Sequence, residues 1–156
     1  MANLEDAIAY LLREYPFKEE LSNARVTKML YLADWHNHIR GKPAVTSIDW
    51  YFDNYGPFVW DVRNAVRNSN NMEIEATLNY YGTPKDQFVL KNKNYHPAIS
   101  EDDKAALDHV ILETKSLTWP SFIKLVYSTY PISSSERYTK LNLTAKAREY
   151  NSLRNQ

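Results

Sequence analysis

The chain contains no cysteine, and this absence excludes three kinds of chemistry. Disulfide bonds, zinc sites built on thiolates and cysteine nucleophiles all require the sulfur of that residue. Glycine is almost as scarce, with three residues at positions 41, 56 and 82. So few glycines cannot build the Gly-rich loops that cradle nucleotide phosphates. Nucleotide binding through either standard loop is therefore not expected.

Long apolar segments and an excess of one charge are also missing. No segment approaches the roughly 18 apolar residues that a membrane-spanning helix needs. The N-terminal segment does not resemble a signal peptide, because Glu5 and Asp6 interrupt it. The 19 basic and 19 acidic residues cancel, which argues against a general polyanion binder. These features predict a cytoplasmic protein with no membrane partner.

Aromatic residues are abundant, at 13% of the chain, and include 12 Tyr and 4 Trp. The hydrophobic share of 44% and the charged share of 24% are ordinary for a soluble globular protein. A chain of 156 residues is long enough to bury a core of its own. We therefore expect one domain, residues 1–156, in which aromatic side chains fill much of the core.

Two segments near the N-terminus have the apolar spacing of helices. Asn3 is the predicted N-cap of a first helix, which Pro16 ends. A second helix is predicted over about residues 24–40, with Ser22 or Asn23 as its cap. This second helix is apolar around most of its circumference, as helices that are surrounded by other helices are. We therefore predict that it is the central element of the fold.

An aromatic segment, residues 49–53, has the pattern of a short strand and leads into a Gly56-Pro57 corner. Pro57 is predicted to occupy the first position of a third helix, where its missing N–H does no harm. Residues 72–78 alternate between apolar and polar, and residues 87–90 can return antiparallel to them. This pattern predicts a β-hairpin.

Three further helices are predicted in the second half, with Ser100, Thr118 and Thr144 as their N-caps. The helix after Thr118 keeps its apolar spacing as far as Tyr130, and the last helix is weaker, with Leu153 facing inward. The expected fold class is α+β, mainly α. Five to six helices would pack around a central apolar helix, with a small antiparallel hairpin or three-stranded sheet on one side.

Asp34 and His38 form the most suggestive ionisable pair, one helical turn apart. Such a pair could orient a general base or donate two metal ligands. Since no third ligand follows at helical spacing, we interpret them as a solvated helix face. His36 is expected to donate to a backbone carbonyl at the edge of the core, whereas His96 and His109 have no partner that the sequence identifies. We predict no catalytic residue, no metal and no cofactor.

Two alternative classes remain open. Several helices and a hairpin are compatible with a winged-helix-like, nucleic-acid-binding regulator. Basic side chains align on one face only in the short C-terminal helix, so this alternative is the weaker one. A metal-dependent hydrolase acting through Asp34 or His38 is weaker still, because no serine elbow, glycine loop or ligand cluster accompanies the pair.

Residues 26–58 resemble the Panacea domain, an antitoxin domain also called SocA-like. The resemblance lies in the helical segment Lys28-Met29-Leu30-Tyr31-Leu32-Ala33 and in the aromatic segment from Trp50 to Pro57. Farther along, a helix opened by Ser100-Glu101 and the segment 127–131 fit the second half of the same domain.

The likeness covers about residues 3–131 and leaves residues 132–156 as a C-terminal extension. Tyr130-Pro131 stands where many relatives carry a His and a Pro-Trp pair, so a role for such a histidine does not carry over to this chain.

The resemblance implies a non-enzymatic, bacterial or phage antitoxin of a toxin–antitoxin system. Its partner would be a cognate protein toxin, which it neutralises by direct protein–protein binding in the cytoplasm. At least one relative looks like an adaptor that hands its toxin to a Clp-type protease. The domain is similar across systems with unrelated toxins, so the identity of the toxin does not transfer.

A neutralising surface needs exposed anchor residues, most often Trp, Tyr and Arg. The candidates are five aromatic residues at two places, the Gly-Pro corner and the hairpin tip: Tyr55, Phe58, Trp60, Tyr80 and Tyr81. Core packing is the ordinary alternative for the three corner residues. The two tip tyrosines are expected to be exposed, which by itself does not indicate binding.

Overall fold

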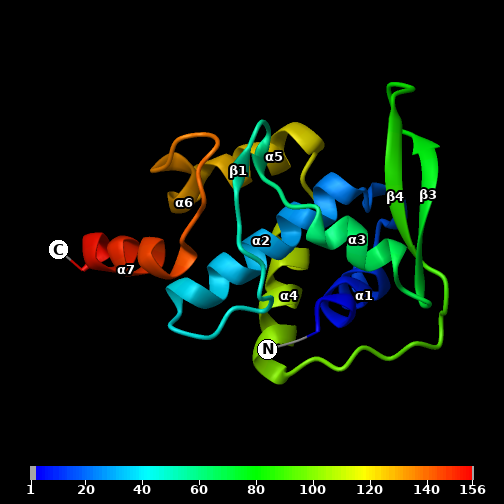
Figure 1. The fold of residues 1–156 in the computed structure, drawn as a ribbon, viewed down its shortest axis with the longest axis horizontal. Coiled ribbons are helices and arrows are strands. Elements are labelled where there is room, and N and C mark those ends of the chain that lie inside the picture. The colour runs from blue at the N-terminus through cyan, green and yellow to red at the C-terminus, as the bar shows by residue number, and fades with distance from the viewer. Residues whose placement is uncertain (1–2, 156) are drawn as a thin grey trace.

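The computed structural model describes residues 3–155 and confirms the α+β, mainly α, fold class (Figure 1). Within these residues it has seven α-helices, a short 3-10 helix and two small antiparallel hairpins. Their bounds in chain order are α1 (Leu4–Glu14), η1 (Lys18–Glu20), α2 (Asn23–Ile39), β1 (Phe52–Asp53), β2 (Gly56–Pro57), α3 (Asp61–Arg67), β3 (Met72–Leu78), β4 (Pro84–Leu90), α4 (Glu101–Thr114), α5 (Trp119–Ser128), α6 (Tyr130–Ser133) and α7 (Leu143–Arg154).

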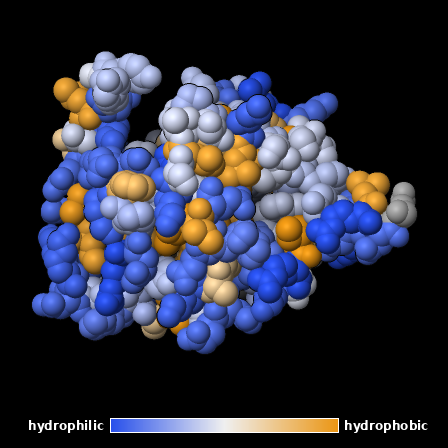
Figure 2. Space-filling view, turned by 180° about the vertical axis from the view of Figure 1, so that it is seen from behind, coloured by the Kyte–Doolittle hydropathy of each residue, from blue (hydrophilic) through white to orange (hydrophobic). Residues whose placement is uncertain are grey.

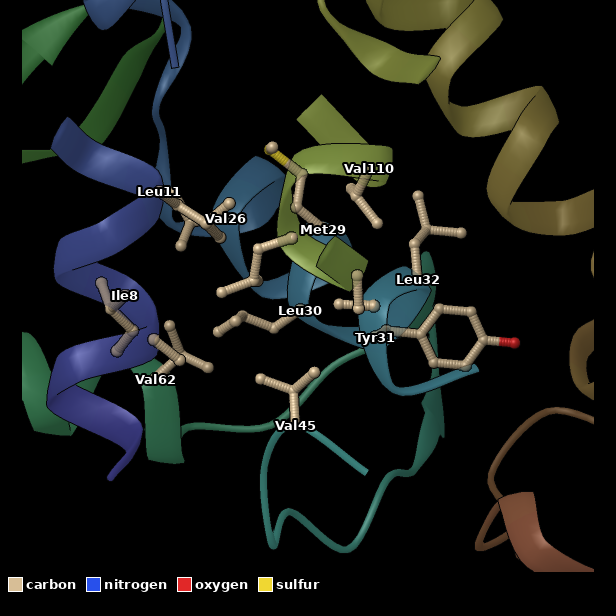
Figure 3. Close-up of a cluster of buried hydrophobic side chains, with 14 of the residues drawn as sticks. Ile8, Leu11, Val26, Met29, Leu30, Tyr31, Leu32, Val45, Val62 and Val110 are labelled. Carbon is tan, nitrogen blue, oxygen red and sulfur yellow. The ribbon is translucent and has the colours of Figure 1, made fainter. Parts of the chain in front are cut away.

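Helix α2 is the centre of the fold, as its apolar circumference predicted. Helices α1, α3, α4 and α7 all pack against it. The Ser22 side chain accepts a hydrogen bond from the Arg25 N–H and caps the helix. Figure 3 shows the apolar side chains of α2 meeting side chains from α1, α3, α4 and the loop after α2, among them Ile8, Leu11, Val45, Val62 and Val110.

The predicted caps of three other helices are confirmed. Asn3, Ser100 and Thr118 each accept a hydrogen bond from a backbone N–H in the first turn of α1, α4 and α5. Each of these side chains satisfies a donor that the start of a helix leaves without a partner. The helix starts were therefore predictable because the signal lies within three residues of the cap.

The last two helices differ from the prediction. Helix α5 ends at Ser128, because Pro131 lacks the amide hydrogen that would continue its ladder, and the four-residue α6 follows. Helix α7 begins two residues earlier than predicted, since Asn142, not Thr144, accepts the capping hydrogen bond. Leu153 was predicted to face inward, but it is exposed.

Pro57 does not begin a helix. It lies in β2 and pairs with Phe52 of β1, so the Gly-Pro corner is a tight hairpin. Gly56 adopts a φ of +105°, a conformation that side-chain-bearing residues rarely take. The chain then turns again, and α3 starts only at Asp61. The strand predicted over residues 49–53 is correspondingly short.

The predicted β3–β4 hairpin is confirmed, with its second strand three residues longer than expected. The Phe88 N–H donates to the Leu21 carbonyl at 2.8 Å and so ties β4 to the chain before α2. Figure 2 shows the far end of this hairpin standing clear of the body, and small groups of hydrophobic side chains scattered over a mostly polar face.

Candidate functional site

The Gly-Pro corner carries exposed aromatic side chains. Tyr55 is 79% exposed and Trp60 is 61% exposed. Phe58 is half-buried and meets Trp60 edge to face, with ring centroids 5.0 Å apart. Core packing, the ordinary alternative for these residues, is therefore wrong for Tyr55 and Trp60. We call Tyr55, Phe58 and Trp60 the corner patch.

A distant segment of the chain braces the corner patch. The Phe52 N–H donates to the Thr139 carbonyl at 2.9 Å, so residues 138–140 run beside β1. The Tyr138 hydroxyl donates to the Asn54 side chain at the turn of the hairpin. Tyr138 is itself exposed and has a positive φ of 67°. No sequence signal marked this contact, because its two sides lie 84 residues apart.

The far end of the β3–β4 hairpin carries a second group of exposed apolar side chains. Tyr80 is 97% exposed, Tyr81 is 88% exposed and Leu78 is 62% exposed. The two tyrosine rings stand edge to face, with centroids 5.6 Å apart. The exposure expected for the tyrosines is confirmed, and their role in binding stays a prediction. We call Leu78, Tyr80 and Tyr81 the tip patch.

The turn beneath the tip patch is held by one side chain. The Asn79 Oδ1 accepts hydrogen bonds from the N–H groups of Tyr81 and Thr83, both at 2.9 Å. Gly82 takes the positive φ that the turn needs. These bonds are all local to the turn.

Asp34 is a buried structural carboxylate, so the interpretation of a solvated helix face is wrong for it. Its side chain is 1% exposed and accepts three hydrogen bonds. The donors are the Thr46 N–H at 2.9 Å, the Thr46 hydroxyl at 2.6 Å and the Trp50 indole N–H at 2.9 Å. Burial raises the pKa of Asp34 to about 6, although these hydrogen bonds oppose the rise. The carboxylate anchors the loop that leads to the corner patch.

His38 lies near Asp34 along a pocket of about 410 Å³ between α2 and the start of α7. The pocket also contains Asp49 and Lys140. Burial lowers the pKa of His38, which favours a neutral ring. Since Asp34 accepts hydrogen bonds from Thr46 and Trp50 and none from His38, the pair does not form the acid–base couple considered from the sequence.

The other histidines contact side chains. The rings of His36 and His109 stack with centroids 4.1 Å apart, and His36 also contacts Arg40 at 3.2 Å. The expected bond from His36 to a backbone carbonyl is therefore wrong. Burial and the nearby positive groups lower the pKa of His36 to about 4. His96 contacts the Arg13 guanidinium at 2.9 Å.

Residues 3–155 contain no group of three or more His, Asp or Glu side chains arranged to hold a metal ion. Over the same described residues, no helix is both long enough and apolar enough to cross a membrane.

Comparison with known families gives one match. Residues 26–131 match the family model described as "Antitoxin SocA-like, Panacea domain". The matched segment begins within α2 and ends within α6, so it includes the corner patch, the tip patch and Asp34. Searches of curated proteins and of solved structures find no match to the chain.

Proposed function

The chain belongs to the family of SocA-like antitoxins with a Panacea domain, and we propose that it neutralises a cognate protein toxin by binding it directly. The observation that carries this proposal is the family match over residues 26–131. The exposed aromatic patches support it, because Trp and Tyr are the residues that most often anchor protein–protein interfaces.

The corner patch is the main docking surface in this proposal. It combines an exposed Trp with an exposed Tyr, and a third ring packs against the Trp. The β1–β2 hairpin and residues 138–140 hold the backbone beneath these rings. Anchors that are already ordered lose little conformational entropy on binding, so they contribute more to affinity than mobile ones.

The tip patch is a secondary docking surface. Tyr80 and Tyr81 are even more exposed than the corner residues, but only local hydrogen bonds hold them. Ordering such a tip on binding offsets part of the gain from its contacts.

We further propose that residues 1–156 act as one domain. Helix α1 and helix α7 lie outside the family match, yet both pack against α2. The rings of Trp35 and Tyr150 pack edge to face with centroids 5.6 Å apart, and the Asn151 side chain donates to the Ile39 carbonyl at 3.1 Å. The C-terminal extension 132–156 supplies the residues that brace the corner patch, so the docking surface depends on it.

Neutralisation can work by covering the toxin or by handing it to a Clp-type protease. The two routes differ in the amount of toxin that remains in the cell. Blocking leaves the toxin level unchanged, whereas delivery to a protease lowers it and requires the protease. Toxin abundance in strains with and without the Clp-type protease separates these routes.

Co-expression with the adjacent gene tests the function. We expect the product of that gene to arrest growth when expressed alone, and this chain to restore growth and to co-purify with it. A neighbour that is harmless alone, or toxicity that this chain does not relieve, would contradict the proposal. A salt-sensitive shift of DNA from the chain's own promoter, without any effect on the neighbour's product, would favour the winged-helix-like regulator instead.

A further inference from the structure

Lys28 is a buried lysine that the scaffold does not pair. Its side chain is 2% exposed on α2. Within residues 3–155 its ammonium makes no hydrogen bond and no ion pair, and the acidic group whose charge attracts it is Asp53, which is too far away to form an ion pair. Asp53 itself accepts a hydrogen bond from the Asn54 N–H. Buried ammonium groups are normally paired, so this one needs an explanation.

The Lys28 side chain runs beneath the Gly-Pro corner. Its Cε lies 3.7 Å from the position that a Cβ on Gly56 would occupy, and the Tyr127 ring lies 3.5 Å from the same position. Lys28 as a whole keeps 2% of its surface exposed. The end of the Lys28 side chain therefore lies beside Gly56, the residue that follows Tyr55 of the corner patch.

Burial opposes the charge of this lysine and lowers its pKa to about 8. The group therefore remains mostly charged at neutral pH, in a place where charge destabilises the fold. A methionine would fill the same space without the free-energy cost of burying a charge. Residues that reduce stability in this way are typical of binding sites, where the partner supplies the missing contact.

On the basis of the proposed antitoxin function, we propose that the Lys28 ammonium binds an acidic side chain, Asp or Glu, of the toxin at the base of the corner patch. The ammonium has three donors, and no acceptor within the described residues bonds to them. A toxin carboxylate that reaches past Gly56 would accept hydrogen bonds from the ammonium. The rings of the corner patch would then exclude water from around this ion pair.

A single carboxylate fits this site better than a polyanion does. Asp53 lies in the β1–β2 hairpin and would repel a run of phosphates, and the chain as a whole carries no net charge. Charge pairs enclosed by an aromatic rim are the arrangement in which removing one partner has a large effect on affinity.

The first arm of the test measures the thermal stability of the protein without its partner. Lys28→Met should raise the melting temperature by about 5 °C, because it removes an unpaired buried charge and keeps the volume. The matched control is Lys104→Met, an exposed lysine of α4, which begins at the opposite end of the molecule from the β1–β2 hairpin (Figure 1). An unchanged or lowered melting temperature for Lys28→Met would mean that Lys28 is structural and would overturn the inference.

The second arm measures binding to the product of the adjacent gene by calorimetry. Lys28→Met should weaken binding at least about tenfold and make it less sensitive to salt, while Lys104→Met binds like the wild type. Equal affinity of the wild type and Lys28→Met would overturn the inference and leave the proposed function standing. If the wild type itself does not bind, the proposed function fails and this inference fails with it.

A double-mutant cycle identifies the partner group. Asp→Asn and Glu→Gln variants of the toxin are combined with Lys28→Met, and one acidic position should show a loss that is not additive with the loss from Lys28→Met. If instead only removal of the toxin's C-terminal carboxylate couples to Lys28, the assignment to an acidic side chain is wrong.

Discussion

The corner patch and the tip patch both expose aromatic rings, but the fold supports them differently. The corner rests on α2, on a two-stranded hairpin and on residues 138–140, which come from a distant part of the chain. The tip rests on its own two strands and on the Asn79 side chain. Exposure alone does not distinguish the two patches, since the tip is the more exposed one.

The two patches therefore differ in how much conformational freedom each must lose when a partner binds. A patch whose backbone is already held presents its rings in one arrangement, so binding removes little conformational freedom. A projecting hairpin end also gains contacts on binding, but it loses conformational freedom at the same time, and this loss reduces the net gain in affinity. We therefore expect the corner to dominate affinity and the tip to contribute less. The predictions below run from the largest expected effect to the smallest.

Asp34→Ala should have the largest effect, and it should loosen the corner but not the tip. The variant leaves the Thr46 N–H and the Trp50 indole N–H buried without an acceptor. We expect a loss of about 3 kcal/mol in the free energy of unfolding, measured by urea denaturation. Hydrogen exchange should accelerate in residues 44–57 and stay unchanged in residues 79–83.

The pH dependence of stability checks the same residue. The folded-state pKa of Asp34 is raised to about 6, so the folded protein binds this proton more tightly than the unfolded chain does. The stability that this provides is present below the unfolded pKa and is lost as the pH rises from about 4 to 6. Asp34→Ala should lack this component; an unchanged pH profile would contradict the raised pKa.

Lys28 should give the corner an alkaline pH dependence that the tip has no means to produce. Its folded-state pKa of about 8 lies below that of an unfolded lysine, so the unfolded chain binds the proton more tightly. The free energy of unfolding should therefore rise as the pH increases above about 8, by up to about 3 kcal/mol if titration could be completed.

Urea denaturation of the wild type and Lys28→Met between pH 7 and pH 9.5 measures this component. The variant should be the more stable protein at pH 7, and the two should converge as the pH rises. Parallel curves would show that the ammonium is not destabilised by burial.

Truncation of the two patches compares them directly. Tyr55→Ala combined with Trp60→Ala should weaken toxin binding by about 2 kcal/mol or more, roughly 30-fold, because central Trp and Tyr anchors carry most of an interface's energy. Tyr80→Ala combined with Tyr81→Ala should weaken binding less than tenfold. Calorimetry with the adjacent gene's product measures both, and unchanged melting temperatures establish that both variants are folded.

Either of two outcomes would break the comparison. A tip variant that loses neutralisation while the corner variant keeps it would make the tip the main docking surface. Two variants that both bind like the wild type would place the interface on neither patch.

Tyr138→Phe should have the smallest effect. It removes the hydroxyl that donates to Asn54 and keeps the ring, so we expect about 1 kcal/mol of lost stability. The loss should appear as faster hydrogen exchange at residues 52–57. Tyr130→Phe, which removes the hydroxyl that donates to the Glu149 carboxylate on the surface, serves as a control that leaves the corner unchanged.

The helices could be predicted from sequence because their signals are local. Asn3, Ser22 and Ser100 each bond to a backbone N–H two or three residues away, and the apolar circumference of α2 follows from its own spacing. The α+β class and the β3–β4 hairpin rest on similarly short patterns.

The corner could not be predicted because its determinants are distant in the sequence. Pro57 fits the first turn of a helix equally well, and pairing with Phe52 decides between the two. Asp34 has the spacing of a polar helix face, and only the loop that brings Thr46 and Trp50 over it shows that it is buried. The same holds for Tyr138, whose partner Asn54 lies 84 residues away in the sequence.

Hydrogen–deuterium exchange of the complex with the adjacent gene's product tests the central claim most directly, since it reports the covered surface without any mutation. The account predicts that residues 51–60 and 137–140 become protected on binding and that residues 78–83 change little. Protection confined to residues 78–83, or to surfaces away from both patches, would contradict it.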